Sequence, residues 1–324
     1  GACGFHWDQL MANKNTEIRR LNGVYGRLMD EAGISLIRGR AILTGPNAVT
    51  VEGSEYTAKY ILVATGSRPV VPDFPGNEHV ITSDEAFHLA ALPERMVMVG
   101  GGYIAVEFAG IFHSLGVAVT QLYRGPLFLR GFDNDLREML AVEMRKQGVD
   151  LRFESQVAKI EKQGKAFQVT LKDGSAVEAD LVMYATGRAP NTKGLGLEVA
   201  GVDLAENGAV KVDNHFCSNV PSVYALGDVI DRVQLTPVAI TEAMCVADHL
   251  FGEGALADMS YDNIPSAVFS HPNLATVGLT EEEARRRFGE VEVYVSSFMA
   301  LKHTLTGRDE NTFMKLVTEP GAGR

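Results

Sequence analysis

The chain has 324 residues, of which 46% are apolar and 22% charged, with 33 glycines and 12 prolines. This composition is typical of a globular α/β protein and excludes a mainly disordered or collagen-like chain, and the length predicts two or three domains. The net charge of −11 argues against a nucleic-acid partner. The longest uncharged run near the strongest motif, residues 96–106, is rich in glycine and too short to cross a bilayer, so no membrane partner is expected.

The cysteine pattern favours a reducing compartment. Cys3, Cys217 and Cys245 are too few and too scattered for a disulfide framework or a four-thiolate zinc site. We interpret all three as bystanders rather than nucleophiles. The eight histidines show no metal-ligand spacing, and the charged opening residues contain no apolar signal-peptide core. A cytoplasmic protein without a metal site is therefore expected.

The first part of the chain predicts a helix that leads into a small sheet. Apolar residues recur at helical spacing over residues 16–29, and short β-like runs follow at residues 34–37 and 49–51. The almost wholly apolar run 60–64 then stops at Thr65-Gly66, which is typical of a buried parallel strand that ends at a loop.

The middle of the chain has the pattern of a βαβ unit. A strand is predicted over residues 96–99, three successive glycines follow, a helix continues to about residue 115, and a second strand covers residues 117–122. Asp133 is the expected N-cap of the next helix, which Gly148 ends. Residues 172–175 then predict a hairpin turn.

Two strand endings have nearly the same sequence. Residues 63–66 read VATG and residues 184–187 read YATG, and an arginine and a proline lie within three residues of each glycine. This repetition predicts two related units. Only the second is preceded by its own glycine-rich βαβ opening, so we expect the first unit to lack its opening strand, turn and helix.

The last part of the chain predicts a return to the first unit and then a separate domain. Residues 222–228 are expected to form a buried strand that ends in Gly-Asp, and Thr236 to cap a helix that ends near residue 251, with Pro237 in its first turn. Beyond residue 261, β segments are expected at residues 267–269, 291–295 and 313–317, and a capping box formed by Thr280 and Glu283 predicts a helix.

The glycine-rich turn is a candidate dinucleotide site. Gly100 allows a tight turn, Gly102 lets the backbone approach a pyrophosphate, and Ala105 allows the helix to pack closely on the strand. Free N–H groups at the start of the helix suit the anion. A glycine-rich packing turn is the alternative, but the position inside a βαβ unit favours nucleotide binding.

The residues after the second strand favour NADPH over NADH. An NAD site needs an acid about 20 residues beyond the glycines to accept a hydrogen bond from the ribose 2′-hydroxyl. No acid occurs from Thr120 to Arg130, whereas Arg124 and Arg130 could hold a 2′-phosphate through bidentate bonds. Two solvated surface arginines are the alternative.

Gly227-Asp228 and the helix that begins at Thr236 suggest a flavin site. Asp228 alone would more often be a loop acid that satisfies its own backbone. The start of the following helix, eight residues later, would however stabilise negative charge on a reduced cofactor ring. His271-Pro272 is interpreted as a turn.

These motifs together resemble the flavin-dependent pyridine nucleotide-disulfide reductases, and among them the bacterial enzymes that reduce glutathione disulfide. The resemblance covers nearly the whole chain. It is carried, in order, by residues 99–107, 123–124, 129–133, 185–188, 225–228, 235–239 and 269–272. It implies electron flow from NADPH through FAD to a redox-active cysteine pair and on to glutathione disulfide, in a homodimer.

The resemblance also implies roles for single residues. Tyr103 would gate the nicotinamide pocket and Glu107 would lie by the flavin. Asp228 would bond to the ribityl chain of the flavin and Thr236 would lie by its ring. The candidate cofactor-binding residues are Gly100, Gly102, Tyr103, Ile104, Ala105, Glu107, Arg124, Arg130, Gly187, Thr65, Gly66, Asp228 and Thr236.

Several family motifs find no match in this sequence. The first GxGxxG, the Cys-x4-Cys disulfide and the lysine after it precede anything that matches Gly1, and the His-Pro-Thr…Glu acid-base motif follows Arg324. The resemblance therefore implies an internal portion of such a reductase, with no catalytic residue and no thiol–disulfide exchange by this polypeptide alone. Met244 stands where some members place an arginine that binds a glutathione carboxylate, so a trypanothione-type substrate stays open.

The expected fold is α/β, with two Rossmann-like (FAD/NAD(P)-binding) domains plus the start of an α+β dimerisation domain. The expected domains are residues 1–85 and 213–260 for FAD, 86–212 for NADPH and 261–324 for the interface. A mercuric-reductase-like enzyme and a non-catalytic NADPH-binding module remain alternatives. Dihydrolipoamide dehydrogenase is disfavoured because no acid lies near Tyr123-Arg124.

Overall fold

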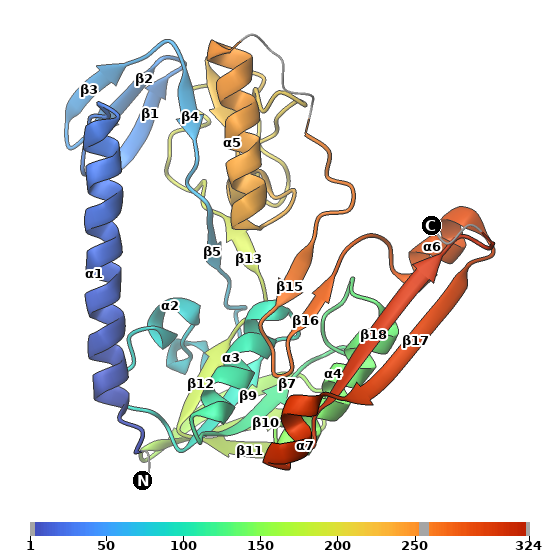
Figure 1. Cartoon of the computed structure of the whole chain (residues 1–324). Helices are drawn as coiled ribbons and strands as arrows, with labels where there is room; N and C mark the ends of the chain where they lie inside the picture. Colours follow the sequence, from blue (N-terminus) through green and yellow to red (C-terminus); the bar gives the residue numbers. More distant parts are fainter. Residues whose placement is uncertain (1–3, 253–258, 322–324) are drawn as a thin grey trace. The chain divides into compact units, whose positions relative to one another are not determined.

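The computed structural model describes residues 4–252 and 259–321 (Figure 1). The chain forms two compact units, each assembled from separate segments of the sequence. Unit 1 comprises Gly1–Asp8, Pro69–Gly187 and Asp262–Arg324, and unit 2 comprises Gln9–Arg68 and Arg188–Tyr261.

A parallel four-stranded sheet organises unit 1. Its strands, in spatial order, are β12 (Leu181–Tyr184), β6 (Arg95–Val99), β7 (Ala118–Leu122) and β8 (Asp150–Arg152). Helix α3 (Tyr103–Ser114) connects β6 to β7, and α4 (Asn134–Gln147) connects β7 to β8. The βαβ unit predicted from the sequence is therefore confirmed.

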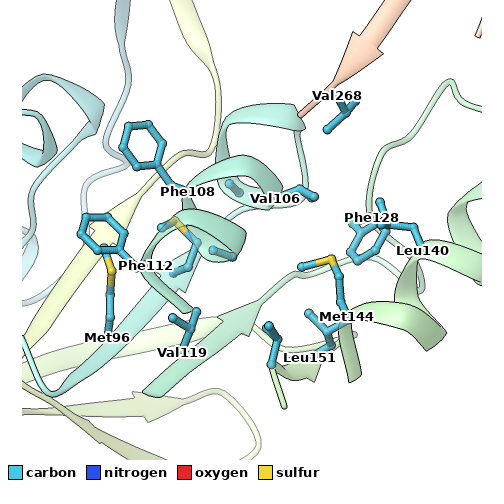
Figure 2. Close-up of a cluster of buried hydrophobic side chains, with 14 of the residues drawn as sticks. Met96, Val106, Phe108, Phe112, Val119, Phe128, Leu140, Met144, Leu151 and Val268 are labelled. Carbon is cyan, nitrogen blue, oxygen red and sulfur yellow. The ribbon is translucent and has the colours of Figure 1, made fainter. Parts of the chain in front are cut away.

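The central strand β6 is buried on both faces. Met96 and Met98 lie in the cluster formed with α3 and α4, which Figure 2 shows around Phe112 and Met144. The alternate residue Val97 faces a second cluster, because successive strand side chains point to opposite faces. An antiparallel sheet covers that second face. Its strands are β9 (Val157–Gln163), β10 (Ala166–Leu171) and β11 (Ala176–Ala179).

The predicted ends of α4 and the predicted hairpin turn are confirmed. Asp133 is the N-cap of α4, and its side chain accepts a hydrogen bond of 3.0 Å from the Asp135 N–H. Gly148 ends the helix in the left-handed conformation, with φ 105°. Residues 172–175 connect the antiparallel strands β10 and β11.

The remaining elements of unit 1 are short, except for a long antiparallel hairpin near the C-terminus (Figure 1). They are η1 (Asn77–His79), α2 (Ser83–Ala86), β15 (Ser266–Val268), β16 (Leu274–Thr276), α6 (Glu281–Phe288), β17 (Glu292–Met299), α7 (Leu301–Thr306) and β18 (Asn311–Thr318). The predicted capping box of Thr280 and Glu283 opens α6.

Unit 2 packs around the parallel pair β4–β14. Its elements are most of α1 (Trp7–Glu31), then β1 (Ala41–Gly45), β2 (Ala48–Val51), β3 (Ser54–Thr57), β4 (Ile61–Val63), β5 (Ser67–Pro69), β13 (Arg188–Pro190), β14 (Val223–Ala225), η2 (Gly227–Ile230) and α5 (Thr236–Phe251). Phe216, Val223 and Ala225 are fully buried at the centre of its core.

Three local predictions in unit 2 differ from the structure. Residues 34–37 form no strand, and Ile34 and Leu36 are each 56% exposed. An apolar run becomes a strand only where a partner supplies a hydrogen-bonding edge, and the β1–β2–β3 sheet begins at Ala41 instead. Thr236 is not an N-cap: Leu235 is, with φ −134° and ψ 134°.

The start of α5 therefore lies one residue earlier than predicted. The carbonyl of Leu235 already accepts the first helical bond, from the Ala239 N–H at 3.0 Å, so Thr236 is the first helical residue. The strand predicted over residues 222–228 also ends early, at Ala225, because Gly227 begins the one-turn helix η2 with φ 72°.

A buried lysine joins three carboxylates in unit 1. The side chain of Lys315 on β18 is 5% exposed, and its Nζ lies 2.9 Å from Asp133 Oδ1, 2.6 Å from Asp135 Oδ2 and 2.7 Å from Glu281 Oε2. The second oxygen of Asp133 accepts a hydrogen bond of 3.0 Å from the Glu281 N–H. One ammonium thus compensates acids at the first turns of both α4 and α6.

We expect Lys315→Met to lower the free energy of unfolding of unit 1 by about 3 kcal/mol, because it leaves the buried Asp133 carboxylate without its counter-ion. Chemical denaturation followed by circular dichroism measures this. Lys159→Met is the matched control, since Lys159 pairs with Glu161 where both side chains are about half exposed. An equal loss in the two variants would contradict the burial argument.

The same cluster predicts acid sensitivity. Burial alone would raise the pKa of Asp133, but the hydrogen bonds from Glu281 and Lys315 outweigh it and hold that pKa below the ordinary value of 3.8. A carboxylate with a lowered folded-state pKa stabilises the fold above its unfolded pKa, and this stabilisation disappears as pH falls through the folded value. The free energy of unfolding should therefore fall below about pH 4, and Asp133→Asn should flatten that fall. Identical pH profiles for the two proteins would refute the assignment.

Candidate functional site

The three glycines after β6 differ in how much space the surrounding protein leaves for a side chain. A side chain at Gly100, where φ is 147°, would collide with the carbonyl of Ala185, and one at Gly101 would collide with the ring of Tyr123. A Cβ at Gly102 would meet nothing within 4 Å. Packing thus explains the first two glycines, whereas Gly102 leaves open space at the start of α3.

That open space suits an anion. Gly102 is the N-cap of α3 and has no side chain to cap the helix, so the first N–H groups of α3 have no acceptor within the helix. The helix dipole adds partial positive charge at this end. Ala105 is fully buried, which allows α3 to lie close to β6, as the sequence predicted for a nucleotide-binding turn.

The loop that follows β7 carries two uncompensated cations. Arg124 and Arg130 are exposed, and neither guanidinium forms an ion pair with any residue in the described ranges 4–252 and 259–321. The first acid after β7 is Asp133, which is already engaged by Lys315 and by the N–H groups of Asp135 and Glu281. No carboxylate of this segment is left to accept a bond from a ribose hydroxyl.

We name residues 123–132 the arginine loop. It is fastened to the glycine-rich turn by a 2.6 Å hydrogen bond from the Leu129 N–H to the Gly101 carbonyl. It is fastened to α4 by Arg137, whose Nε donates to the Phe128 carbonyl at 2.6 Å and whose Nη2 donates to the Leu127 carbonyl at 2.7 Å. The loop therefore has a defined backbone rather than a freely moving one.

The other candidate residues of unit 1 lie on the same elements. Tyr103 begins α3 and is 38% exposed, and Ile104 behind it packs against the core. Glu107 Oε1 accepts a hydrogen bond of 2.8 Å from the Phe269 N–H. Gly187 follows β12, and its carbonyl accepts from Val70 at 3.0 Å. Because β12, β6 and β7 are parallel neighbours, their carboxyl ends bring these residues to one edge of the sheet.

Unit 2 holds the remaining candidates at the ends of its parallel pair. Asp228 Oδ2 accepts a hydrogen bond of 2.6 Å from the Ser67 hydroxyl, which in turn accepts from Arg188 Nε at 2.7 Å. The other carboxylate oxygen of Asp228 accepts no hydrogen bond from the part of the chain that the structure describes. It is thus available to a hydroxyl of a ligand.

Thr65 and Gly66 lie beside Asp228, since β4 and β14 are adjacent and parallel. The Thr65 hydroxyl donates to the Asn191 carbonyl at 2.9 Å. In unit 1 the Thr186 hydroxyl makes the corresponding bond, of 3.0 Å, to the Val70 carbonyl. The two repeated sequences therefore have the same local geometry: each ends a parallel strand and ties its threonine to a neighbouring segment.

Sequence reasoning missed the residue that holds the Gly-Asp turn. Glu242 on α5 is 1% exposed; its carboxylate accepts from the Gly227 N–H at 2.6 Å and from the Tyr261 hydroxyl at 2.7 Å. Burial, together with this bond to the carboxylate, raises the pKa of Tyr261 to about 12. A single acid on the otherwise apolar buried face of α5 was the signal available in the sequence.

A buried glutamine holds the glycine-rich turn in the same way. Gln121 on β7 is 1% exposed and donates from Nε2 to the Gly100 carbonyl at 3.0 Å. His271 lies in the turn between β15 and β16, as predicted, with its ring against Gly110 of α3. Thr236, the first residue of α5, is exposed.

No group of three or more potential metal ligands occurs among residues 4–252 and 259–321. In the same ranges, no helix has the length and apolarity needed to span a membrane. Cys217 and Cys245 are not joined in a disulfide, and Cys3 lies outside the described residues.

Comparison with known proteins agrees with this geometry. The family model described as pyridine nucleotide-disulphide oxidoreductase matches residues 5–243, and the dimerisation domain of the same family matches residues 264–324. A glutathione reductase from Burkholderia cepacia is 50% identical over 98% of this chain and 70% of that protein. A trypanothione reductase from Trypanosoma congolense is 40% identical over 98% of this chain and 68% of that protein.

A solved structure extends the likeness to three dimensions. The HOCl-induced flavoprotein disulfide reductase RclA from Escherichia coli aligns with a TM-score of 0.90 and 31% identity, covering 96% of this chain and 72% of that one. The expected α/β fold class and the resemblance read from the motifs are both confirmed. With a glycine-rich βαβ turn in place and family models that match both of its parts, the chain belongs to the pyridine nucleotide-disulphide oxidoreductases.

Proposed function

We propose that this protein is a flavoenzyme that uses NADPH to reduce glutathione disulfide. NADPH supplies a hydride and solvent supplies a proton, the disulfide bond breaks, and two thiols of glutathione are released. The observation that carries the NADPH part is the pair of uncompensated cations, Arg124 and Arg130, beside the open glycine-rich turn at Gly102. The substrate part rests on the 50% identity with a glutathione reductase.

NADPH binds at the carboxyl edge of the parallel sheet in unit 1. The backbone at Gly102 and the first N–H groups of α3 receive the pyrophosphate. Arg124 and Arg130 hold the 2′-phosphate, because guanidinium groups form paired, charge-assisted hydrogen bonds with phosphate oxygens. Tyr103, exposed at the start of α3, covers the nicotinamide. Gly100, Ile104 and Ala105 shape the turn through their packing, and the exposed Gly187 lies at the same edge of the sheet.

The residues of unit 2 fit FAD. When bound, FAD accepts the hydride and passes the electrons on to a disulfide. The free carboxylate oxygen of Asp228 suits a ribityl hydroxyl, and Thr65 and Gly66 lie beside it. The N-terminus of α5 at Thr236 would stabilise negative charge on the reduced ring. Glu107, held by the Phe269 N–H, is assigned to the flavin by the family pattern alone.

This proposal assigns a role to each segment. Residues 1–85 and 213–260 are assigned to the FAD-binding part, residues 86–212 to the NADPH-binding part, and residues 261–324 to the start of the dimerisation domain of a homodimer, which the second family match supports. The compact units divide the chain differently, because residues 69–85 lie in unit 1 and residues 188–212 lie in unit 2. We also infer a cytoplasmic location, because the few scattered cysteines suit a reducing compartment.

Trypanothione disulfide is the second candidate substrate. Met244 on α5, 57% exposed, occupies the position where some family members place an arginine for a glutathione carboxylate. A methionine at this position cannot form the ion pair that an arginine would form with a glutathione carboxylate. The greater identity to a glutathione reductase than to a trypanothione reductase favours glutathione.

Removing both guanidinium groups tests the coenzyme assignment. Arg124→Leu combined with Arg130→Leu should weaken NADPH binding by about 100-fold, since each lost charged hydrogen-bonding group is equivalent to roughly tenfold, and should leave NADH binding nearly unchanged. Calorimetric titration of the chain measures both constants. Arg286→Leu with Arg287→Leu removes the same charge from exposed positions on α6 and serves as the control. Equal loss for the two coenzymes would refute the assignment.

The substrate is tested on protein expressed from the whole open reading frame in which this sequence lies. We expect NADPH oxidation with glutathione disulfide to exceed that with trypanothione disulfide, and Met244→Arg to lower KM for glutathione disulfide by several-fold through one added charged contact. Steady-state kinetics with both disulfides gives the answer. Faster turnover of trypanothione disulfide would establish the second candidate instead.

A further inference from the structure

The arginine loop contains a strained residue directly before one of its two cations. Leu129 has φ 53°, a left-handed conformation that leucine adopts only where its surroundings impose it. Its side chain is 2% exposed and that of Phe128 is fully buried, so these two residues anchor the loop in the core. The direction in which Arg130 leaves the loop depends on how well this backbone is held.

Arg137 holds that backbone from one turn inside α4. Its Nε and Nη2 donate to the carbonyls of Phe128 and Leu127, two successive peptide units, at 2.6 Å and 2.7 Å. The planar fork of a guanidinium suits such a paired contact, which a lysine ammonium cannot reproduce. Nη1 faces Asn134 Oδ1 at 3.5 Å, so all three nitrogens of Arg137 are directed at the protein.

The place of Arg137 in α4 is itself well fixed. Asp133, the N-cap of α4, is held by the buried Lys315 and by the Glu281 N–H. The Arg137 N–H also bonds to the Asp133 carbonyl, at 3.2 Å. Arg137 thus connects the arginine loop, which carries Arg130, to the first turn of α4, which is itself held in place.

We propose that Arg137 is a positioning residue that sets the preference for NADPH over NADH by fixing the backbone on which Arg130 is presented. This inference rests on the proposed function, in which Arg130 binds the 2′-phosphate. Arg137 acts through the loop and not by touching the phosphate, because its nitrogens are occupied by the carbonyls of Leu127 and Phe128 and by Asn134. Without it, the two carbonyls lose their donors and the left-handed backbone at Leu129 relaxes.

The test is calorimetric binding of NADPH and of NADH to the 324-residue chain, expressed as the ratio of the two dissociation constants. Arg137→Met should reduce the preference for NADPH by about tenfold through weaker NADPH binding alone, the loss expected for one misplaced charge-assisted contact. Arg137→Lys keeps the charge but replaces the planar fork of the guanidinium with a single nitrogen, so it should show an intermediate loss. Thermal unfolding of each variant shows whether it is folded. If Arg137→Met does not fold, the test uses Arg137→Lys.

Arg95→Met is the matched control. Arg95 is likewise a hydrogen-bonded arginine of unit 1, with Asp180 and Glu178 as its partners, but it lies at the amino end of β6, away from the glycine-rich turn. Its loss should lower stability and leave the coenzyme preference unchanged. A change in preference with Arg95→Met as large as with Arg137→Met would overturn the proposal, because loss of stability alone would then explain both.

A double-mutant cycle separates positioning from a direct charge effect. In the Arg130→Leu background, Arg137→Met should have little further effect, since the residue through which it acts is gone. An undiminished tenfold effect there would overturn the proposal in favour of direct attraction by Arg137. No effect of Arg137→Met in the parent chain, with a large effect of Arg130→Leu, would overturn the inference and leave the proposed function intact. No effect of Arg130→Leu would refute the 2′-phosphate site itself, and the inference with it.

Discussion

The burial of β6 on both faces is the constraint from which the unit 1 site follows. Parallel neighbours on each side hold the strand in register, and its alternating methionines and valines fill the clusters above and below the sheet. The backbone that leaves such a strand must turn sharply. Gly100 and Gly101 make that turn against Ala185 and Tyr123, and α3 begins with its free N–H groups at the open position of Gly102.

The second constraint is the distribution of charge around that turn. The net charge of the chain is −11, yet the segment beside the glycines carries two uncompensated cations. The first acids that follow this segment in the sequence, Asp133 and Asp135, are engaged elsewhere, because the buried Lys315 binds both of them together with Glu281. The same cluster that joins α4, α6 and β18 thereby leaves Arg124 and Arg130 available to an anion. The proposed coenzyme preference and the stability of unit 1 thus depend on the same few carboxylates.

In both units a buried polar side chain reaches the backbone of the turn that carries the site. Gln121 donates to Gly100, and Glu242 accepts from Gly227. Arg137 does the same for the arginine loop. A turn made of glycine and small residues has no large side chains of its own to hold its backbone in place. A hydrogen bond from a side chain on a neighbouring strand or helix holds it instead. Motif matching does not identify such supporting residues, because the motif is defined by the residues of the turn alone.

Elements whose signals lie within a few neighbouring residues could be predicted from the sequence. The caps Asp133 and Gly148, the capping box of Thr280 and Glu283 and the turn at the three glycines depend on residues a few positions apart, and each was predicted correctly. The other features depend on the folded chain. Residues 34–37 stay unpaired because a strand needs a partner edge, α5 begins after Leu235, and the partners of Lys315, Glu242 and Arg137 lie on separate elements. Only folding brings such distant groups within hydrogen-bonding distance, so no sequence window contained them.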